Sequence, residues 1–215
     1  MKLRLDGIDF SYHGNQPVFK NLNLTIPLNC WAVLTGDCGT GKTTLAKLIA
    51  GLLKPDKGSI RFENDNGLNN SLEVGYIFQN PDDQFVHFNI EREVAFNLEN
   101  RGASPAIVRK AVQLALESVN LWPRRENSPH ELSGGEKQKL TIADWLVSKP
   151  QVLIFDETTA FLDLPTRFEL YENIRRLIVA GLSVIWISQE DYEIAFADYI
   201  IELLPGYLLR TSSNK

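Results

Sequence analysis

Apolar and polar residues alternate in two stretches near the start of the chain, at Leu3, Leu5, Leu22, Leu24 and Ile26. A period of two is typical of a strand with one buried face. Three later stretches, at residues 31–34, 152–155 and 184–187, are instead continuously apolar. Such short runs predict strands that are buried on both faces, as in the centre of a parallel sheet.

Helical patterns lie between these predicted strands. One helix is expected to begin after Gly41 and to end near Gly51, and another should run from Pro165 to about Gly181. Residues 90–148 read as mostly helical, and Ser104 is expected to cap a helix in that region. The apolar stripe of this helix is expected to comprise Ile107, Val108, Ala111, Val112, Ala115 and Val119. Strands that alternate with helices predict a mainly parallel sheet, with a β-rich start and a helical middle as additions.

Composition narrows the classes of function. The chain has 215 residues, is 44% hydrophobic, and carries 27 acidic against 22 basic residues. A net charge of −5 argues against a nucleic-acid binder that relies on bulk positive charge. The start of the chain has no long apolar core of a signal peptide. The longest apolar-rich stretch, 177–187, is shorter than the roughly 20 residues of a membrane span, so a membrane role is expected to come through a partner.

A phosphate-binding loop is indicated at residues 36–43, which match the pattern G-x-x-x-x-G-K-[ST] between a predicted strand and a predicted helix. Its backbone N–H groups can point at phosphate oxygens. Lys42 can reach the outer phosphates, and the Thr43 hydroxyl can bind Mg²⁺. The alternative is a glycine-rich turn with an exposed lysine. For Cys38, a redox-sensitive position and a thiol that merely fills a solvent-facing place are both open, and the second is favoured.

Two acids, Asp156 and Glu157, end the second buried strand. Asp156 is suited to holding Mg²⁺, and Glu157 can polarise an attacking water as a general base. Taken alone, the pair could equally cap the following turn.

Residues 132–138, Leu-Ser-Gly-Gly-Glu-Lys-Gln, resemble the signature motif of ATP-binding cassette (ABC) ATPases. Ser133 lies 23 residues before Asp156, a spacing that the family shares. Two glycines at a helix start leave backbone N–H groups open to phosphate. The resemblance implies that Ser133, Gly134 and Gly135 bind the γ-phosphate of a nucleotide held by the opposite subunit; a plain capped helix start is the simpler alternative.

The resemblance covers nearly the whole chain and implies further roles. Tyr12 matches the aromatic residue that stacks on adenine, Gln79 matches the glutamine that contacts Mg²⁺ and senses a membrane partner, and residues 160–163 match a loop at the dimer interface. The implied ATP site in the phosphate loop comprises Gly36, Asp37, Cys38, Gly39, Thr40, Gly41, Lys42, Thr43 and Thr44.

The resemblance also implies the fold. It is a phosphate-loop NTPase with a RecA-like, mainly parallel sheet, an N-terminal antiparallel β subdomain and an inserted helical subdomain. Residues 1–215 would form a single nucleotide-binding domain, with the helical subdomain at about 84–148.

One subgroup is the most similar. Residues 76–85, 93–100 and 129–132 resemble the ATPases of energy-coupling factor transporters, which import vitamins and transition-metal ions. One departure stands out, because Gln189 occupies the position of the histidine that usually contacts the γ-phosphate. Glutamine keeps a donor and an acceptor but has no titratable charge, so we expect ATP hydrolysis to be slow.

The resemblance implies two subunits that sandwich two ATP molecules head to tail, on the cytoplasmic face of the cell membrane, with a transmembrane subunit as partner. Apolar residues after Gln79 are candidates for contact with that partner, although each could belong to the core: Phe85, Val86, Phe88 and Phe96. Two alternatives remain. One is a non-transport ABC ATPase that acts as an ATP-gated clamp, and the other is a binding-only module with degenerate hydrolysis.

Overall fold

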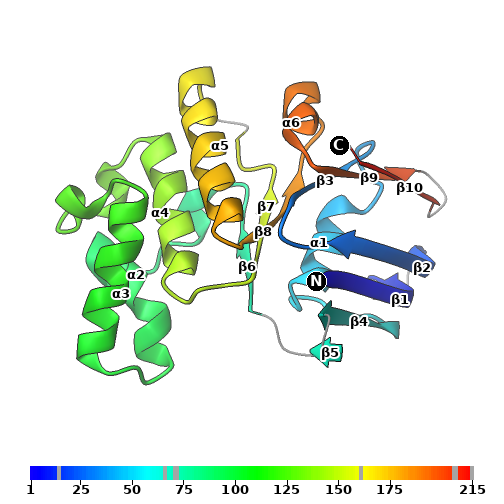
Figure 1. Cartoon of the computed structure of the whole chain (residues 1–215), viewed down its shortest axis with the longest axis horizontal. Coiled ribbons are helices and arrows are strands. Elements are labelled where there is room, and N and C mark those ends of the chain that lie inside the picture. Colours follow the sequence, from blue (N-terminus) through cyan, green and yellow to red (C-terminus); the bar gives the residue numbers. More distant parts are fainter. Residues whose placement is uncertain (14–15, 65–66, 70–72, 160–161, 205–207, 214–215) are drawn as a thin grey trace. The chain divides into compact units, whose positions relative to one another are not determined.

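The computed structural model describes residues 1–13, 16–64, 67–69, 73–159, 162–204 and 208–213 (Figure 1). By its contacts the chain divides into two compact units. The sheet unit comprises residues 1–76, 151–157 and 177–215, and the helical unit comprises residues 77–150 and 158–176. No helix among the described residues is long and apolar enough to cross a membrane.

The first sheet of the sheet unit is antiparallel, in the order β2-β1-β4-β5. Its strands are β1 (Lys2–Ser11), β2 (Pro17–Pro27), β4 (Lys57–Asn64) and β5 (Gly67–Asn69). Leu3 pairs with Ile26 and Leu5 with Leu24, and all four side chains are buried. The alternation of apolar and polar residues therefore corresponds to a sheet with one face in the core, as predicted.

The second sheet has six strands, in the order β10-β9-β3-β8-β7-β6. They are β3 (Trp31–Thr35), β6 (Val74–Ile77), β7 (Val152–Asp156), β8 (Ser183–Ile187), β9 (Tyr199–Leu204) and β10 (Leu208–Ser213). The pairs β3–β8, β3–β9 and β7–β8 are parallel, whereas β9 and β10 form an antiparallel hairpin. The mainly parallel sheet is confirmed, and β10 is an element that the sequence patterns did not reveal.

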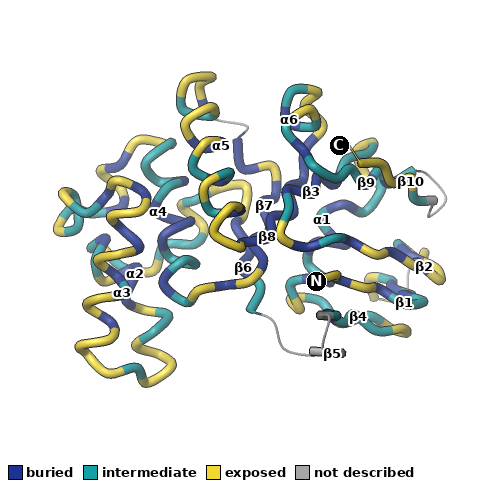
Figure 2. Tube along the Cα trace, viewed as in Figure 1, coloured by how far each residue is buried: buried dark blue, intermediate teal, exposed yellow. Residues whose placement is uncertain are grey.

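The central strands are buried on both faces, as their continuous apolar runs predict; β7 and β8 are dark along their length in Figure 2. The Phe155 ring stacks on Trp186, with ring centroids 4.4 Å apart. The Trp31 ring is tilted against Trp186, with centroids 5.2 Å apart. In the register, Leu34 lies opposite Ile187, and Ile187 lies opposite Asp156. The parallel register therefore brings the carboxyl ends of β3, β7 and β8 to one edge of the sheet.

Two helices of the sheet unit adjoin this edge in sequence: α1 (Lys42–Ile49), which follows β3, and α6 (Asp191–Phe196), which follows β8. The helix predicted after Gly41 is confirmed.

The helical unit contains α2 (Ile90–Asn100), α3 (Pro105–Ser118) and α4 (Gly134–Leu146), which pack on one another. Short 3-10 turns lie at Pro81–Asp83, Trp122–Arg124 and Pro129–Glu131. The helix α5 (Leu164–Val179) belongs to this unit as far as Arg176.

The stripe predicted for α3 is partly wrong. Ile107, which was predicted to belong to the stripe, is 60% exposed. Leu116, which the predicted stripe did not include, is buried beside Val112 and Ala115. Successive residues of a helix are about 100° apart, so Ile107 lies to one side of the face that Val108 starts. Ser104 is the N-cap residue, as predicted, but its side chain makes no capping hydrogen bond.

Candidate functional site

The phosphate loop joins β3 to α1, and its lysine is held by the loop itself. Lys42 is buried, and its Nζ donates hydrogen bonds of 2.8 Å to the carbonyl oxygens of Gly36 and of Asp37. The Thr40 hydroxyl also donates to the Asp37 carbonyl, at 2.9 Å. These bonds fold residues 36–42 into a tight turn with a positive charge inside it.

Two glycines of this loop are required by close packing. Gly36 has φ of 132°, and a Cβ there would collide with the Leu203 carbonyl of β9. Gly41 has φ of 99°, and a Cβ there would lie 2.9 Å from the Phe19 ring. Gly41 is also the N-cap of α1, so no side chain caps the helix start, whose N–H groups and dipole attract anions. The loop is therefore built as an anion cradle.

Asp156 ends β7, and both of its carboxylate oxygens accept hydrogen bonds from hydroxyl groups. The Thr43 hydroxyl donates to Oδ1 at 3.2 Å, and the Tyr76 hydroxyl donates to Oδ2 at 2.5 Å. A hydroxyl and a carboxylate next to a phosphate cradle are the oxygen ligands that Mg²⁺ takes when phosphates supply further ones. The donor set therefore fits Mg²⁺.

Glu157 follows Asp156 in a strained backbone conformation. Its φ is 50°, in the left-handed region that non-glycine residues rarely adopt. A hydrogen bond of 3.3 Å from its N–H to the Ile187 carbonyl of β8 supports this conformation, and the residue is exposed. The chain thus turns sharply after β7 and presents a carboxylate at the sheet edge.

Gln189 lies just beyond β8 and contacts the phosphate loop. Its Nε2 donates a hydrogen bond of 2.9 Å to the Gly36 carbonyl, the same oxygen that accepts from Lys42. The neighbouring Ser188 N–H donates to the Leu34 carbonyl at 3.2 Å. The Gln189 side chain is therefore tied to the first glycine of the loop.

Tyr12 follows β1 and approaches the start of α1. Its hydroxyl shares a hydrogen bond of 3.2 Å with the Thr44 hydroxyl, and the Phe10 ring packs against it edge to face at 4.9 Å. Tyr12 is still 39% exposed. An aromatic ring that is held from one side and open on the other can stack on a base.

The sheet unit thus gathers the phosphate loop, Tyr12, Asp156, Glu157 and Gln189, as the motifs predict. The remaining candidates belong to the helical unit. Gln79 is exposed just after β6, and Ser133 with its two glycines starts α4. Ala160 and Phe161 of the predicted interface loop lie outside the described residues.

The start of α4 carries a full capping box. The Ser133 hydroxyl accepts from the Glu136 N–H at 3.3 Å, and the Ser133 N–H donates to Glu136 Oε2 at 2.9 Å. That N–H bond, with help from Arg124, holds the pKa of Glu136 below its ordinary value. Gly135 packs against Thr166, where a Cβ would collide with the threonine methyl group. Ser133 and Gly134 are exposed, so an outside group can reach this helix start.

An exposed apolar patch follows Gln79, and we define it as Val86, Phe88 and Phe96. Phe88 is 83% exposed. Glu93 of α2 supports this segment, because its Oε2 accepts the N–H groups of Val86 at 2.9 Å and His87 at 2.6 Å. Phe85 is only half-buried. Sequence reasoning missed the supporting role of Glu93, for which spacing alone offers no signal.

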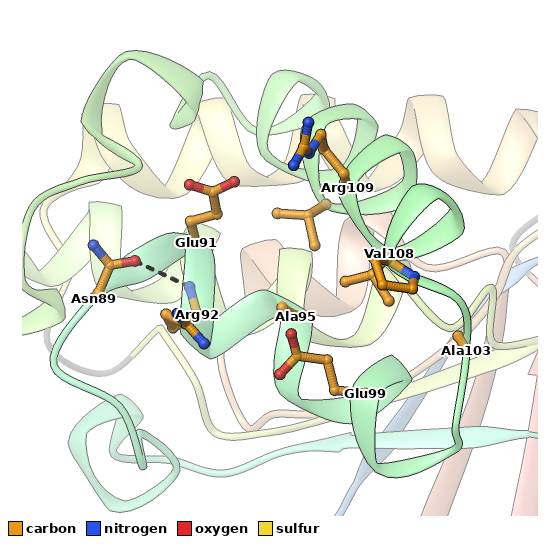
Figure 3. Close-up of a pocket in the computed structure, with 10 residues that line it drawn as sticks. Asn89, Glu91, Arg92, Ala95, Glu99, Ala103, Val108 and Arg109 are labelled. Atoms are coloured by element: carbon orange, nitrogen blue, oxygen red, sulfur yellow. Dashed lines mark hydrogen bonds between the residues drawn. The ribbon is translucent and has the colours of Figure 1, made fainter.

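A groove of about 600 Å³ lies between α2 and α3 of the same unit (Figure 3). Apolar residues such as Ala95, Val108 and Val112 line it together with four charged ones, Glu91, Arg92, Glu99 and Arg109. The Asn89 side chain caps α2 by accepting the Arg92 N–H at 3.1 Å. The groove combines apolar surface with charges of both signs.

The chain is similar in sequence to known proteins. Residues 19–160 match the family described as ABC transporter. The energy-coupling factor transporter ATP-binding protein EcfA1 of Oceanobacillus iheyensis is 39% identical over 93% of this chain and 74% of its own length. EcfA1 of Streptococcus pyogenes serotype M5 is 35% identical over 98% of this chain and 78% of its own.

A solved structure is also similar. CbiO1 from Clostridium perfringens, described as part of the ABC transporter complex cbiONQ, has a TM-score of 0.81 and 28% identity, and the match covers 94% of this chain and 84% of that one. The predicted phosphate-loop NTPase fold is therefore confirmed. Together with the sheet edge that carries Lys42, Asp156 and Glu157, these matches show that the chain belongs to the ABC transporter family, among its energy-coupling factor ATP-binding proteins.

Proposed function

We propose that this chain is the ATP-hydrolysing subunit of an energy-coupling factor importer of a vitamin or a transition-metal ion. The observation that carries the proposal is the sheet edge where Lys42, Thr43, Asp156 and Glu157 come together, in a chain whose relatives are named as ATP-binding subunits of such transporters.

ATP binds, on this proposal, with its phosphates in the loop of residues 36–44 and its adenine on Tyr12. Lys42 exchanges its bonds to the loop carbonyls for bonds to the outer phosphates. Thr43 and Asp156 would hold Mg²⁺, which would neutralise charge that develops on the phosphates. The contacts of Thr43 with Asp156 and of Tyr12 with Thr44 support these assignments.

Hydrolysis depends on Glu157 as general base for the attacking water. Its strained backbone fits this task, since strain of this kind is found at sites where a side chain must be held in one direction. Gln189 contributes hydrogen bonding but no charge, and its bond to the Gly36 carbonyl occupies one of the two N–H donors of its amide. We therefore propose that turnover is slow.

Two ATPase subunits cooperate head to tail. Ser133, Gly134 and Gly135 of one subunit face the phosphates held by the other. In support, Ser133 and Gly134 are exposed at the N-terminus of a 13-residue helix, whose dipole favours an anion. The second subunit is either a copy of this chain or a related one.

A transmembrane subunit docks on the helical unit, on the cytoplasmic side of the membrane. The patch of Val86, Phe88 and Phe96 offers apolar surface, and the groove between α2 and α3 offers charges of both signs for orientation. A short amphipathic helix with an apolar face and charged ends fits such a surface. The movement that follows ATP hydrolysis would be transmitted to the transmembrane subunit through this docked helix.

The experiment is affinity purification of the tagged chain from detergent-solubilised membranes of its native cells. We expect an integral membrane protein, identified by mass spectrometry, together with ATPase activity that Mg²⁺ supports. Phe88→Ser should reduce recovery of that protein about ten-fold, because an exposed aromatic anchor is lost. Val179→Ser, a change at an equally exposed apolar residue of α5, is the control. Recovery of ribosomes or DNA in place of a membrane protein would contradict the proposal.

A further inference from the structure

Tyr76 lies in β6, next to the strand that carries Asp156, and is 2% exposed. Its hydroxyl donates a 2.5 Å hydrogen bond to Asp156 Oδ2. The other carboxylate oxygen, Oδ1, accepts from the Thr43 hydroxyl at 3.2 Å. One carboxylate is thus held by two hydroxyl groups, one from each side.

We propose that Tyr76 is a positioning residue of the metal site: its hydroxyl occupies Oδ2 of Asp156 and keeps Oδ1 directed at the Thr43 hydroxyl. The inference rests on the proposed function, which places Mg²⁺ at Thr43 and Asp156. It adds a residue that no phosphate-loop motif includes.

The physical argument starts from the freedom of the aspartate side chain. A carboxyl group rotates broadly about its last torsion, so its two oxygens can exchange places unless something distinguishes them. The Tyr76 hydroxyl distinguishes them, because it is fixed by a buried ring in a sheet strand. A charge-assisted O–H bond of this length is among the stronger hydrogen bonds in proteins.

The Tyr76 hydroxyl has a single proton, and that proton is used in the bond to Asp156. The alternative is that the bond only satisfies a buried tyrosine, without consequence for metal binding.

A titration distinguishes the two. Binding of a fluorescent methylanthraniloyl-ATP to the purified full chain is followed while Mg²⁺ is added, starting from excess EDTA. In Tyr76→Phe the Mg²⁺ midpoint should rise about five-fold or more, since Asp156 loses a hydrogen bond to a charged group. Binding without metal should change by less than about two-fold. Tyr199→Phe, which removes a hydroxyl that donates to the Thr25 carbonyl of the same unit, is the matched control.

A double-mutant cycle tests whether Tyr76 affects Mg²⁺ binding through Asp156. In the Asp156→Asn background, Tyr76→Phe should produce no further rise of the midpoint, because Tyr76 acts through the carboxylate. Tyr76→Met, which fills similar space without a hydroxyl, is the second variant should Tyr76→Phe fail to fold, and it carries the same expectation.

An unchanged midpoint, an equal loss of binding in EDTA, or additive effects with Asp156→Asn would each overturn the inference. If nucleotide binding by the wild-type chain does not respond to Mg²⁺, that result would instead contradict the proposed metal site at Thr43 and Asp156. The two failures are therefore distinguishable.

Discussion

Asp156 of the sheet unit and Asp144 of the helical unit have buried carboxylate oxygens that differ in their hydrogen bonding. In the sheet unit, Asp156 receives hydroxyl donors on both oxygens, from Thr43 and Tyr76. In the helical unit, Glu93 accepts two backbone N–H groups, while the buried Oδ1 of Asp144 has no hydrogen-bond partner among the described residues. Burial raises the pKa of Asp144 well above its usual range, and nearby Glu93 raises it further.

This difference indicates separate roles for Asp156 and Asp144. Hydroxyl donors fix where the oxygens of Asp156 point, which suits a ligand of a cation. Burial of a carboxylate oxygen that has no donor, such as Oδ1 of Asp144, favours the neutral carboxyl group. We therefore expect changes at the sheet-unit site to alter ligand binding and hydrolysis, and changes at Asp144 to alter stability and its pH dependence.

The largest effect is expected from Lys42→Ala. The loop would lose the ammonium group that its carbonyls hold in place, and the affinity for ATP should fall about 100-fold or more. Isothermal titration calorimetry checks this. Lys47→Ala, in the last turn of the same helix, should leave the affinity within about two-fold. Wild-type affinity in Lys42→Ala would show that the loop does not bind the phosphates.

Glu157→Gln should reduce turnover about 100-fold while ATP binding persists, because the general base is lost and the loop is intact. An ATP-bound dimer should then accumulate. Light scattering after size-exclusion chromatography in Mg²⁺ and ATP measures its mass. Glu172→Gln on α5 is the control for loss of an exposed carboxylate. A Glu157→Gln chain that stays monomeric at saturating Mg²⁺-ATP is the contrary result.

Gln189→His should raise turnover by about ten-fold, a change of about 1.4 kcal/mol in the barrier. A histidine would provide the hydrogen-bonding and titratable group that the resemblance to ABC ATPases implies for this position. Steady-state phosphate release measures the change. Gln189→Ala, which removes the bond to the Gly36 carbonyl, separates gain of the histidine from loss of that bond. If Gln189→His does not raise turnover, the native glutamine at this position does not limit the rate of hydrolysis.

The smallest effect is expected from Asp144→Asn, and it concerns stability. The folded-state pKa of Asp144 is raised, so the stability that the neutral group contributes is complete below its ordinary value of 3.8 and is lost as the pH rises through the raised pKa. Asn cannot ionise, and Asp144→Asn should therefore raise the melting temperature about 3 °C at pH 9 and less at pH 4.

Differential scanning fluorimetry from pH 4 to pH 9 makes this measurement, with ATP affinity as the control that should not move. A melting difference that is independent of pH would show that Asp144 is ionised in the folded protein. In that case the contrast between the two units would no longer hold.

Local spacing predicted much of the fold and of the site. The loop with its glycines and Lys42, the acids at the end of β7 and the capping box at Ser133 are each contained in fewer than about ten residues. The hydrogen bonds of Lys42 and of the capping box also form within those segments. Continuous apolar runs identified β3, β7 and β8, because a strand buried on both faces needs no polar positions. The strand β10 has neither an apolar run nor an alternation of apolar and polar residues, so no pattern in the sequence indicated it.

By itself, the sequence indicated which groups are candidates for the chemistry, and it predicted the parallel sheet whose edge carries several of them. Only the tertiary structure decided their partners. Tyr76 and Asp156 are 80 positions apart, and Gln189 and Gly36 are 153 apart. Such bonds depend on strand order and register, which side-chain periodicity along the chain does not encode. The face of α3 that is buried was decided in the same way, by the helices that pack against it.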